Sequence, residues 1–150
     1  MNLKRYPYFT TNNFQEYSFY SEGPKGSIKK VVKFMKAQND PIVYNLGFGD
    51  EDPLTGLVND VVVTDNKDRD IILATVANTI NNFCDRHGNH YIYAEGSTAA
   101  RTRLYQMGIS RLWKEISLGF DVYGLKDGSF YDFQLNVNYE AFLVRRKIKQ

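Results

Sequence analysis

Several short stretches of the chain alternate apolar and polar residues, which is the pattern of strands with one buried face. Aromatic and β-branched residues fill these stretches, and turn formers such as Gly23-Pro24 and Asp40-Pro41 bound them. The pattern predicts strands at Glu16–Ser21, Ile28–Met35, Ile42–Phe48, Leu57–Thr64, His90–Glu95, Phe120–Leu125, Phe130–Val137 and Ala141–Arg146. In the second of these, Val32 and Phe34 share one side and Lys33 and Met35 share the other. The second and third strands, and the sixth and seventh, are spaced to form hairpins.

One stretch changes to the period of a helix. Asp65-Asn66 supplies an N-cap, and Arg86-His87-Gly88 supplies last-turn cations followed by a glycine, so we expect a helix over about Lys67 to Arg86. Its apolar residues recur every three or four positions and should be buried together. They are Ile72, Val76, Ile80 and Phe83.

A second helix is predicted from Ala99 to about Gly119. Gly96-Ser97-Thr98 precedes it and offers a hydroxyl cap, while Gly108 is expected to kink or divide it, with Ser110 capping a second part. The order of elements predicts an α+β fold: a mostly antiparallel sheet of about six to eight strands, with two main helices packed on one face. We expect residues 1–150 to form a single domain.

Composition narrows the class of protein. The single cysteine, Cys84, excludes an intramolecular disulfide framework and a cysteine-based zinc site. No apolar run follows the basic residues at the start of the chain, and no stretch is long enough to cross a bilayer. We therefore expect a soluble cytoplasmic protein with no membrane partner and no cofactor.

The net charge of +2 does not by itself predict a polyanionic partner, but the charges are segregated. Acids predominate between Asp40 and Asp70, whereas the segment from Arg101 to Lys114 carries bases and no acid. A basic C-terminal tail is predicted at about 145–150, partly exposed and with mobile last residues.

The segment in which a strand leads through Gly96-Ser97-Thr98 into a helix has the composition of an anion-binding site. A helix N-terminus presents unpaired backbone N–H groups and a partial positive charge, the glycine permits close approach, and the hydroxyls add donors. Arg101 follows one turn later and could reach the same anion, whereas Arg103 points elsewhere. A plain helix cap explains the same residues, and caps are commoner than anion sites.

Three consecutive acids, Asp50, Glu51 and Asp52, offer a second candidate site. Clustered carboxylates can hold Mg²⁺ or Ca²⁺, and a nuclease would use such a metal against a scissile phosphate. The spacing of an EF-hand is absent, and Asp-Glu-Asp-Pro is also ordinary turn chemistry.

Two further features are weaker. Cys84 and His87 lie one turn apart on the first helix, but no oxyanion site accompanies them.

Some aromatic residues of the strands should face away from the helices, where they could form a homodimer interface or stack on single-stranded bases. We rank dimerisation above base stacking. The residues concerned are Tyr17, Phe19, Tyr20, Tyr91, Tyr93, Tyr123, Phe130, Tyr131 and Phe133.

Four stretches, taken in order, resemble a family of small bacterial proteins known as a domain of unknown function. The resemblance covers the chain from about Gly26 onward and implies a bacterial cytoplasmic origin, but it brings no activity, cofactor or catalytic residue. The stretches are Tyr44-Asn45-Leu46-Gly47-Phe48-Gly49-Asp50, Leu73-Ala74-Thr75-Val76-Ala77, Gly96-Ser97-Thr98-Ala99-Ala100-Arg101-Thr102-Arg103-Leu104-Tyr105 and Asn138-Tyr139-Glu140-Ala141-Phe142.

These observations favour a non-enzymatic binding or interaction module. It would seat a phosphate-bearing or nucleic-acid partner at Gly96, Ser97, Thr98 and Arg101, with no catalytic residue and no metal. Two different functions stay open: a metal-dependent nuclease or phosphoryl hydrolase that uses the acidic loop, and a structural homo-oligomer without a ligand. Convergence of the acidic loop and Arg101 on one cleft would favour the enzyme.

Overall fold

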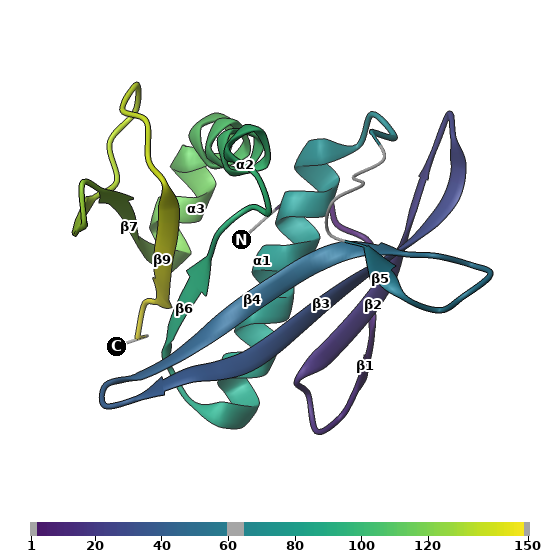
Figure 1. The fold of residues 1–150 in the computed structure, drawn as a ribbon, viewed down its shortest axis with the longest axis horizontal. Coiled ribbons are helices and arrows are strands. Elements are labelled where there is room, and N and C mark those ends of the chain that lie inside the picture. Colours follow the sequence, from purple (N-terminus) through teal and green to yellow (C-terminus); the bar gives the residue numbers. More distant parts are fainter. Residues whose placement is uncertain (1–2, 60–64, 149–150) are drawn as a thin grey trace.

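Nine strands form one sheet, and three helices pack against it, in the computed structural model, which describes residues 3–59 and 65–148 (Figure 1). The strands are β1 (Phe9–Thr11), β2 (Glu16–Gly23), β3 (Gly26–Asn39), β4 (Ile42–Glu51), β5 (Val58–Asn59), β6 (Tyr91–Ala94), β7 (Phe120–Lys126), β8 (Ser129–Asp132) and β9 (Ala141–Arg146). The helices are α1 (Arg69–His87), α2 (Ala99–Arg111) and α3 (Trp113–Gly119).

The sheet runs in the order β1-β2-β3-β4-β6-β9-β7-β8, with β5 paired to β4. β4 and β6 pair in parallel, and the other described pairs are antiparallel. This confirms the α+β class, the mostly antiparallel sheet and both predicted hairpins, β3–β4 and β7–β8. The sheet has one strand more than the predicted six to eight because β1, with three residues, is too short to show an alternating pattern. Of the strand predicted at Leu57–Thr64, residues 60–64 lie outside the described residues.

Helix α1 begins later than the sequence predicts. Lys67 has a φ of 60°, in the left-handed region, which a helical residue cannot adopt. The N-cap is therefore Asp68, and Asn66 instead accepts a hydrogen bond from the Lys25 N–H (2.7 Å) and donates one to the Gly26 carbonyl (2.8 Å). The predicted cap residue thus anchors the β2–β3 turn.

The break between α2 and α3 falls at Leu112, not at Gly108. Gly108 stays within α2 because its missing side chain lets the helix approach α1: a Cβ there would lie 2.9 Å from Leu73 Cδ2. The predicted interruption is therefore wrong in position, and the glycine marks a close contact between helices. This break divides the second predicted helix into two, which accounts for the third helix.

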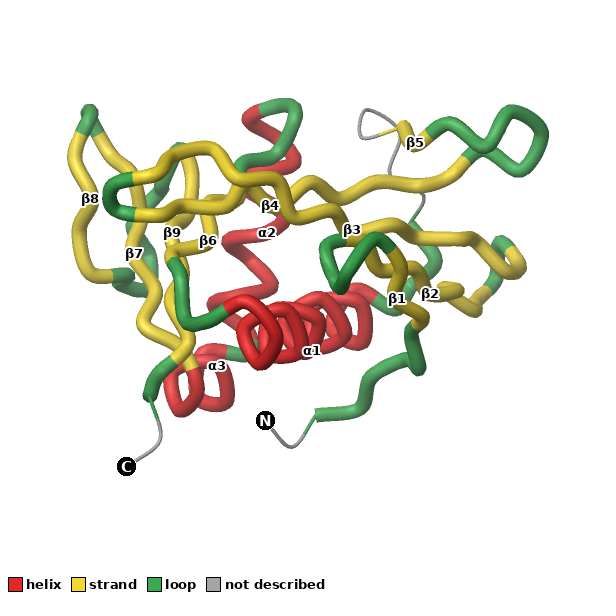
Figure 2. The backbone as a smooth tube through the Cα atoms, turned by 90° about the horizontal axis from the view of Figure 1, so that it is seen from below, coloured by secondary structure: helices red, strands yellow, loops and turns green. Residues whose placement is uncertain are grey.

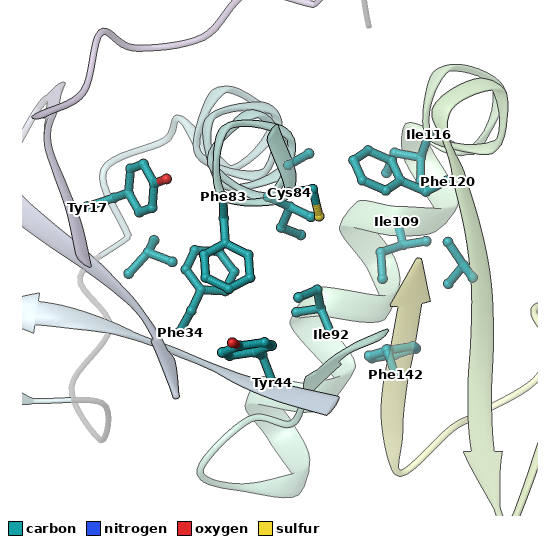
Figure 3. Close-up of a cluster of buried hydrophobic side chains, with 14 of the residues drawn as sticks. Tyr17, Phe34, Tyr44, Phe83, Cys84, Ile92, Ile109, Ile116, Phe120 and Phe142 are labelled. Carbon is teal, nitrogen blue, oxygen red and sulfur yellow. The ribbon is translucent and has the colours of Figure 1, made fainter. Parts of the chain in front are cut away.

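Figure 2 shows α1 and α3 on one side of β3 and β4, whereas α2 runs from beside α1 across the level of β4. One buried cluster joins the helices to the strands. At its centre Phe83 of α1 stacks on Phe34 of β3, with ring centroids 4.3 Å apart, and meets Tyr44 of β4 edge-on at 4.8 Å (Figure 3). Phe83 is fully buried and Ile80 nearly so, as the helical pattern predicts. Ile109, Ile116 and Phe120 continue the cluster toward α2, α3 and β7.

The opposite face of β6, β9 and β7 carries several of the aromatic residues predicted to face away from the helices. Tyr91 and Tyr93 flank the buried Ile92, so they point to this open face, and the guanidinium of Arg145 lies 4.9 Å from the ring centroid of Tyr91. By contrast Tyr17, Phe19 and Phe133 are core residues. The homodimer and base-stacking hypotheses for the open face stay predictions.

The basic run near the C-terminus begins inside the sheet. Arg145 and Arg146 belong to β9, and Arg146 reaches α1, where it pairs with Asp85 (2.5 Å) and donates to Asn89 Oδ1 (2.9 Å). Lys147 continues the pairing by donating its N–H to the Gly119 carbonyl. Arg146 and Lys147 therefore bind the end of β9 to α1 and α3, whereas Arg145 lies against Tyr91 on the open face. Residues 149–150 lie outside the described residues.

Candidate functional site

An apolar cavity of about 200 Å³ lies between α1, α2 and the central strands; we call it the α1–α2 cavity. Most of its lining is aliphatic or aromatic, contributed by the two helices and by β4, β6, β7 and β9. The apolar lining residues are Leu46, Phe48, Ile72, Leu73, Val76, Ala77, Ile80, Ile92, Ala94, Leu104, Tyr105, Gly108, Ile109, Phe120, Val122, Phe142 and Val144.

The cavity explains why the apolar stripe of α1 is not uniformly buried. Ile72, Val76 and Ile80 all line the cavity, but Ile72 and Val76, toward the start of the helix, are only half-buried, whereas Ile80 and Phe83 are buried. Leu46 and Phe48 of β4 are half-buried in the same way. The prediction that all four stripe residues are buried together is therefore correct for the C-terminal half of α1 and only partly correct for the N-terminal half.

Charged side chains join the lining where α1 begins and along α2. Arg69 pairs with Asp65 at 3.2 Å, and Arg111 of α2 pairs with Asp70 of α1 at 2.8 Å, which ties the two helices together. Arg101, in the first turn of α2, is half-buried and also lines the cavity. An apolar chamber with charged residues of both signs in its lining is typical of sites for small amphipathic molecules.

Two acids line the cavity, Asp65 and Asp68. Asp65 is exposed, whereas Asp68, the N-cap of α1, is buried, with 6% of its surface exposed. Its Oδ2 accepts hydrogen bonds from Ser21 Oγ (2.5 Å) and Tyr6 OH (2.6 Å). Its side chain makes no capping hydrogen bond to α1, and its Oδ1 has no hydrogen-bond partner among the described residues. Burial and the hydrogen bond to Asp68 raise the pKa of Tyr6, so Tyr6 remains the donor.

The predicted anion-binding segment is built as a helix cap with one side on the cavity. Thr98 is the N-cap of α2, and its Oγ1 accepts from the Arg101 N–H at 3.2 Å. The Gly96 N–H donates to Thr102 Oγ1 at 3.0 Å, and a Cβ on Gly96 would lie 2.5 Å from the Thr102 nitrogen. The glycine is therefore required by the packing of α2 against the end of β6. Ser97 is exposed, and anion binding at Gly96, Ser97, Thr98 and Arg101 stays a prediction.

The acidic loop lies apart from the cavity lining, and each carboxylate has an internal partner. Asp50 pairs with Lys30 at 2.5 Å, Glu51 pairs with Lys29 at 3.0 Å, and Asp52 accepts from the Leu54 N–H at 2.8 Å. Asp50 and Glu51 are consecutive in β4, so they point to opposite faces of the sheet. None of the three lines the cavity that Arg101 lines.

The described residues contain neither a metal-binding cluster nor a membrane-spanning helix. Within residues 3–59 and 65–148, no three His, Cys, Asp or Glu side chains are grouped so as to hold a metal ion. In the same part of the chain, no helix is both long and apolar enough to cross a membrane.

Cys84 and His87 do not form a reactive pair. His87 stacks on Phe83 at 4.6 Å, and its Nε2 lies 2.7 Å from the Asn13 carbonyl oxygen, while Cys84 is buried in the core. Burial raises the pKa of the Cys84 thiol above its usual range.

We therefore expect the native protein to react with 5,5′-dithiobis(2-nitrobenzoate) at pH 8 at least about a hundredfold more slowly than the unfolded chain. The raised pKa leaves little of the Cys84 thiol ionised, and burial keeps the reagent away from it. The absorbance of the released thionitrobenzoate measures the rate, and the chain in guanidinium chloride should release one equivalent from its one cysteine. Native reaction at the unfolded rate would show Cys84 to be accessible.

Sequence reasoning missed the α1–α2 cavity and the role of Asp68. Cavities arise from how helices cross a sheet, which local patterns do not encode. No local signal indicated the cavity, because Ile72, Val76, Ile80 and Phe83 form a single stripe on one face of the predicted helix.

Comparison with known proteins identifies a family but no close relative of established role. Residues 2–147 match the model of a Family of unknown function (DUF6934). No curated protein and no solved structure matches the chain. The match spans nearly the whole chain, including the strands before Gly26 and every element that lines the cavity, so the chain belongs to this family of unknown function.

Proposed function

We propose that this protein is a non-enzymatic binding module that holds the apolar body of a small molecule in the α1–α2 cavity. The observation that carries the proposal is the cavity itself, about 200 Å³ lined almost throughout by apolar side chains. A dry apolar cavity of roughly 150 Å³ already accepts benzene in another protein, so this one has room for an aromatic or short aliphatic group. Burial of that group would supply the affinity.

We further propose that the ligand carries an anionic group beside Arg101. This arginine belongs both to the predicted anion-binding segment and to the lining of the cavity, so one molecule could use both. A carboxylate or phosphate accepts charge-assisted hydrogen bonds from a guanidinium, and the N-terminus of α2 favours negative charge nearby. A nucleic-acid partner is the second kind of anionic ligand to test, and duplex or single-stranded DNA can replace the small probe in the same assay.

The acidic loop supports the non-enzymatic proposal over a metal-dependent hydrolase. A catalytic metal needs carboxylates that converge on one point, whereas Asp50 and Glu51 leave opposite faces of β4 and are already ion-paired.

We expect 1-anilinonaphthalene-8-sulfonate, an aromatic body with a sulfonate, to bind the native protein at one site with increased fluorescence. Val76→Phe should weaken this binding at least about tenfold, because the added ring occupies the cavity. Val58→Phe is the matched control: it makes the same change on β5, which does not line the cavity, and should bind the dye normally. Equal binding by both variants would contradict the proposal.

The anionic part of the proposal has its own pair of variants. Arg101→Ala should weaken dye binding about three- to tenfold with a nearly unchanged melting temperature, as expected for a lost charge-assisted hydrogen bond. Arg103→Ala removes the same charge from an exposed position of α2 where the side chain bonds Asn138, and should have no effect. If Arg101→Ala unfolds the protein instead, Arg101 belongs to the scaffold and the anion site is rejected.

A further inference from the structure

Asp68 holds a buried hydrogen-bond acceptor that the fold leaves unused. The carboxylate is fixed by Ser21 and Tyr6, which both donate to Oδ2, while Oδ1 is buried and has no partner among the described residues. Buried polar atoms of this kind are rare, because an unsatisfied one loses its hydrogen bonds to water without replacement. Asp68 occupies the N-cap position of α1, but its side chain accepts no hydrogen bond from the backbone N–H groups of this helix. The fold therefore fixes the position of Asp68 through Oδ2 and leaves Oδ1 as an acceptor without a partner among the described residues.

The position of Asp68 connects this unused oxygen to the ligand site. Asp68 lies at the start of α1 and belongs to the lining of the α1–α2 cavity, beside the half-buried Ile72. A ligand whose apolar body fills the cavity therefore lies against Asp68. Resting on the proposed function, we infer that Asp68 is a polar subsite of the α1–α2 cavity and accepts a hydrogen bond from the ligand.

The charges around the cavity indicate which kind of donor fits. Three arginines, Arg69, Arg101 and Arg111, contribute to the lining against two acids, Asp65 and Asp68, so an ammonium group would meet a net positive charge on entering. A hydroxyl or amide N–H donates to a carboxylate without that repulsion. The ligand class is thus a small molecule with an apolar body and a neutral hydroxyl or amide donor, in addition to the anionic group proposed at Arg101.

The test compares benzyl alcohol with benzyl methyl ether, which share the aromatic body and differ in the donor. Affinities are obtained by ligand-observed NMR titration. The native protein should bind the alcohol about tenfold more tightly than the ether, since only the alcohol donates to a charged acceptor. Asp68→Asn keeps an acceptor oxygen for Ser21 and Tyr6 and replaces the other oxygen by an amide donor, which serves both compounds. In this variant the ratio of affinities should fall to about one.

Asp70→Asn is the matched control, because Asp70 is exposed, pairs with Arg111 and does not line the cavity. Its alcohol-to-ether ratio should equal that of the native protein. An alcohol-to-ether affinity ratio near one in the native protein overturns the inference, and so does an unchanged ratio in Asp68→Asn. If Asp68→Asn does not fold, the ratio measured on the native protein is the deciding result. If dye binding is blocked by Val76→Phe while the ratio is one, only this inference fails. If the dye and both benzyl compounds do not bind, the proposed function fails as well.

Discussion

Replacing Asp50 by Ala should lower the free energy of unfolding by about 3–5 kcal/mol, the loss typical of breaking a buried ion pair by removing one partner. The Lys30 side chain is fully buried and that of Asp50 is 11% exposed, with Nζ and Oδ1 2.5 Å apart. Removing Asp50 leaves a buried ammonium without this counter-charge, and its desolvation is no longer offset. Urea denaturation followed by circular dichroism measures the change.

Two further variants distinguish the loss of the Lys30–Asp50 ion pair from the effect of any substitution at the end of β4. Glu51→Ala removes the neighbouring ion pair, in which both side chains are about one-quarter to one-third exposed, and should cost less than about 1 kcal/mol. The double variant Lys30→Met with Asp50→Leu exchanges the pair for apolar groups and should recover most of the stability lost in Asp50→Ala. If Asp50→Ala costs no more than Glu51→Ala, the pair is not the stabilising element.

This prediction also decides how the acidic loop is interpreted. A carboxylate that holds a catalytic metal is usually dispensable for folding, whereas Asp50 is expected to be required for it. Strong destabilisation by Asp50→Ala, with little effect of Glu51→Ala, would therefore assign the first acid to the scaffold and the second to the surface. The hydrolase hypothesis would then lack the cluster on which it depends.

The buried lysine could have been predicted from the alternation of β3. The sequence places Val32 and Phe34 on one side of this strand, and Lys30 stands at the next position of the same side. Likewise Asp50 follows Leu46 and Phe48 at intervals of two in β4. Applying the period strictly would have placed an ion pair on the helix-facing side, instead of an acidic loop in solvent.

Local patterns predicted the elements whose residues interact with near neighbours in sequence. Helix α1 and the β3–β4 and β7–β8 hairpins were correct because their periodicity, caps and turns are local. A helix such as α1 is the usual connection between parallel strands, but whether β4 and β6 are neighbours in the sheet is decided by tertiary packing, so this pairing was not predicted. The same limit applies to the cavity, because its lining comes from α1, α2 and four strands that are far apart in the chain.

In the candidate site, too, the sequence indicated residues that belong to a local motif and missed those brought together by tertiary packing. The sequence indicated Arg101 and the Gly96-Ser97-Thr98 cap, because a strand, a glycine and hydroxyl residues before a helix form a local motif. Asp68 falls near the start of the helix predicted over about Lys67 to Arg86, where the expected effect of a carboxylate is electrostatic. That Asp68 instead bonds Ser21 and Tyr6, from distant parts of the chain, could not be read from spacing.

Truncating Phe83 to Ala should lower the free energy of unfolding by about 3–5 kcal/mol, the range for large aromatic side chains removed from a core. Phe83 is fully buried and its ring contacts three others: Phe34 and His87 by stacking and Tyr44 edge-on. These contacts join α1 to β3 and β4, so the variant loses both buried apolar area and the aromatic geometry that aligns helix and sheet. The midpoint of urea denaturation and the melting temperature should both fall.

Phe83→Leu is the graded control, because leucine refills most of the space and loses mainly the ring contacts. It should cost about 1–2 kcal/mol, less than half the loss in Phe83→Ala. The α1–α2 cavity gives a second comparison, since Phe83 does not line it and Val76 does. Phe83→Ala should therefore bind 1-anilinonaphthalene-8-sulfonate with native affinity at temperatures where it is folded. Weakened dye binding by the folded Phe83 variant would show that the core and the cavity are not independent, and a loss below about 1 kcal/mol would show that α1 does not pack through this ring.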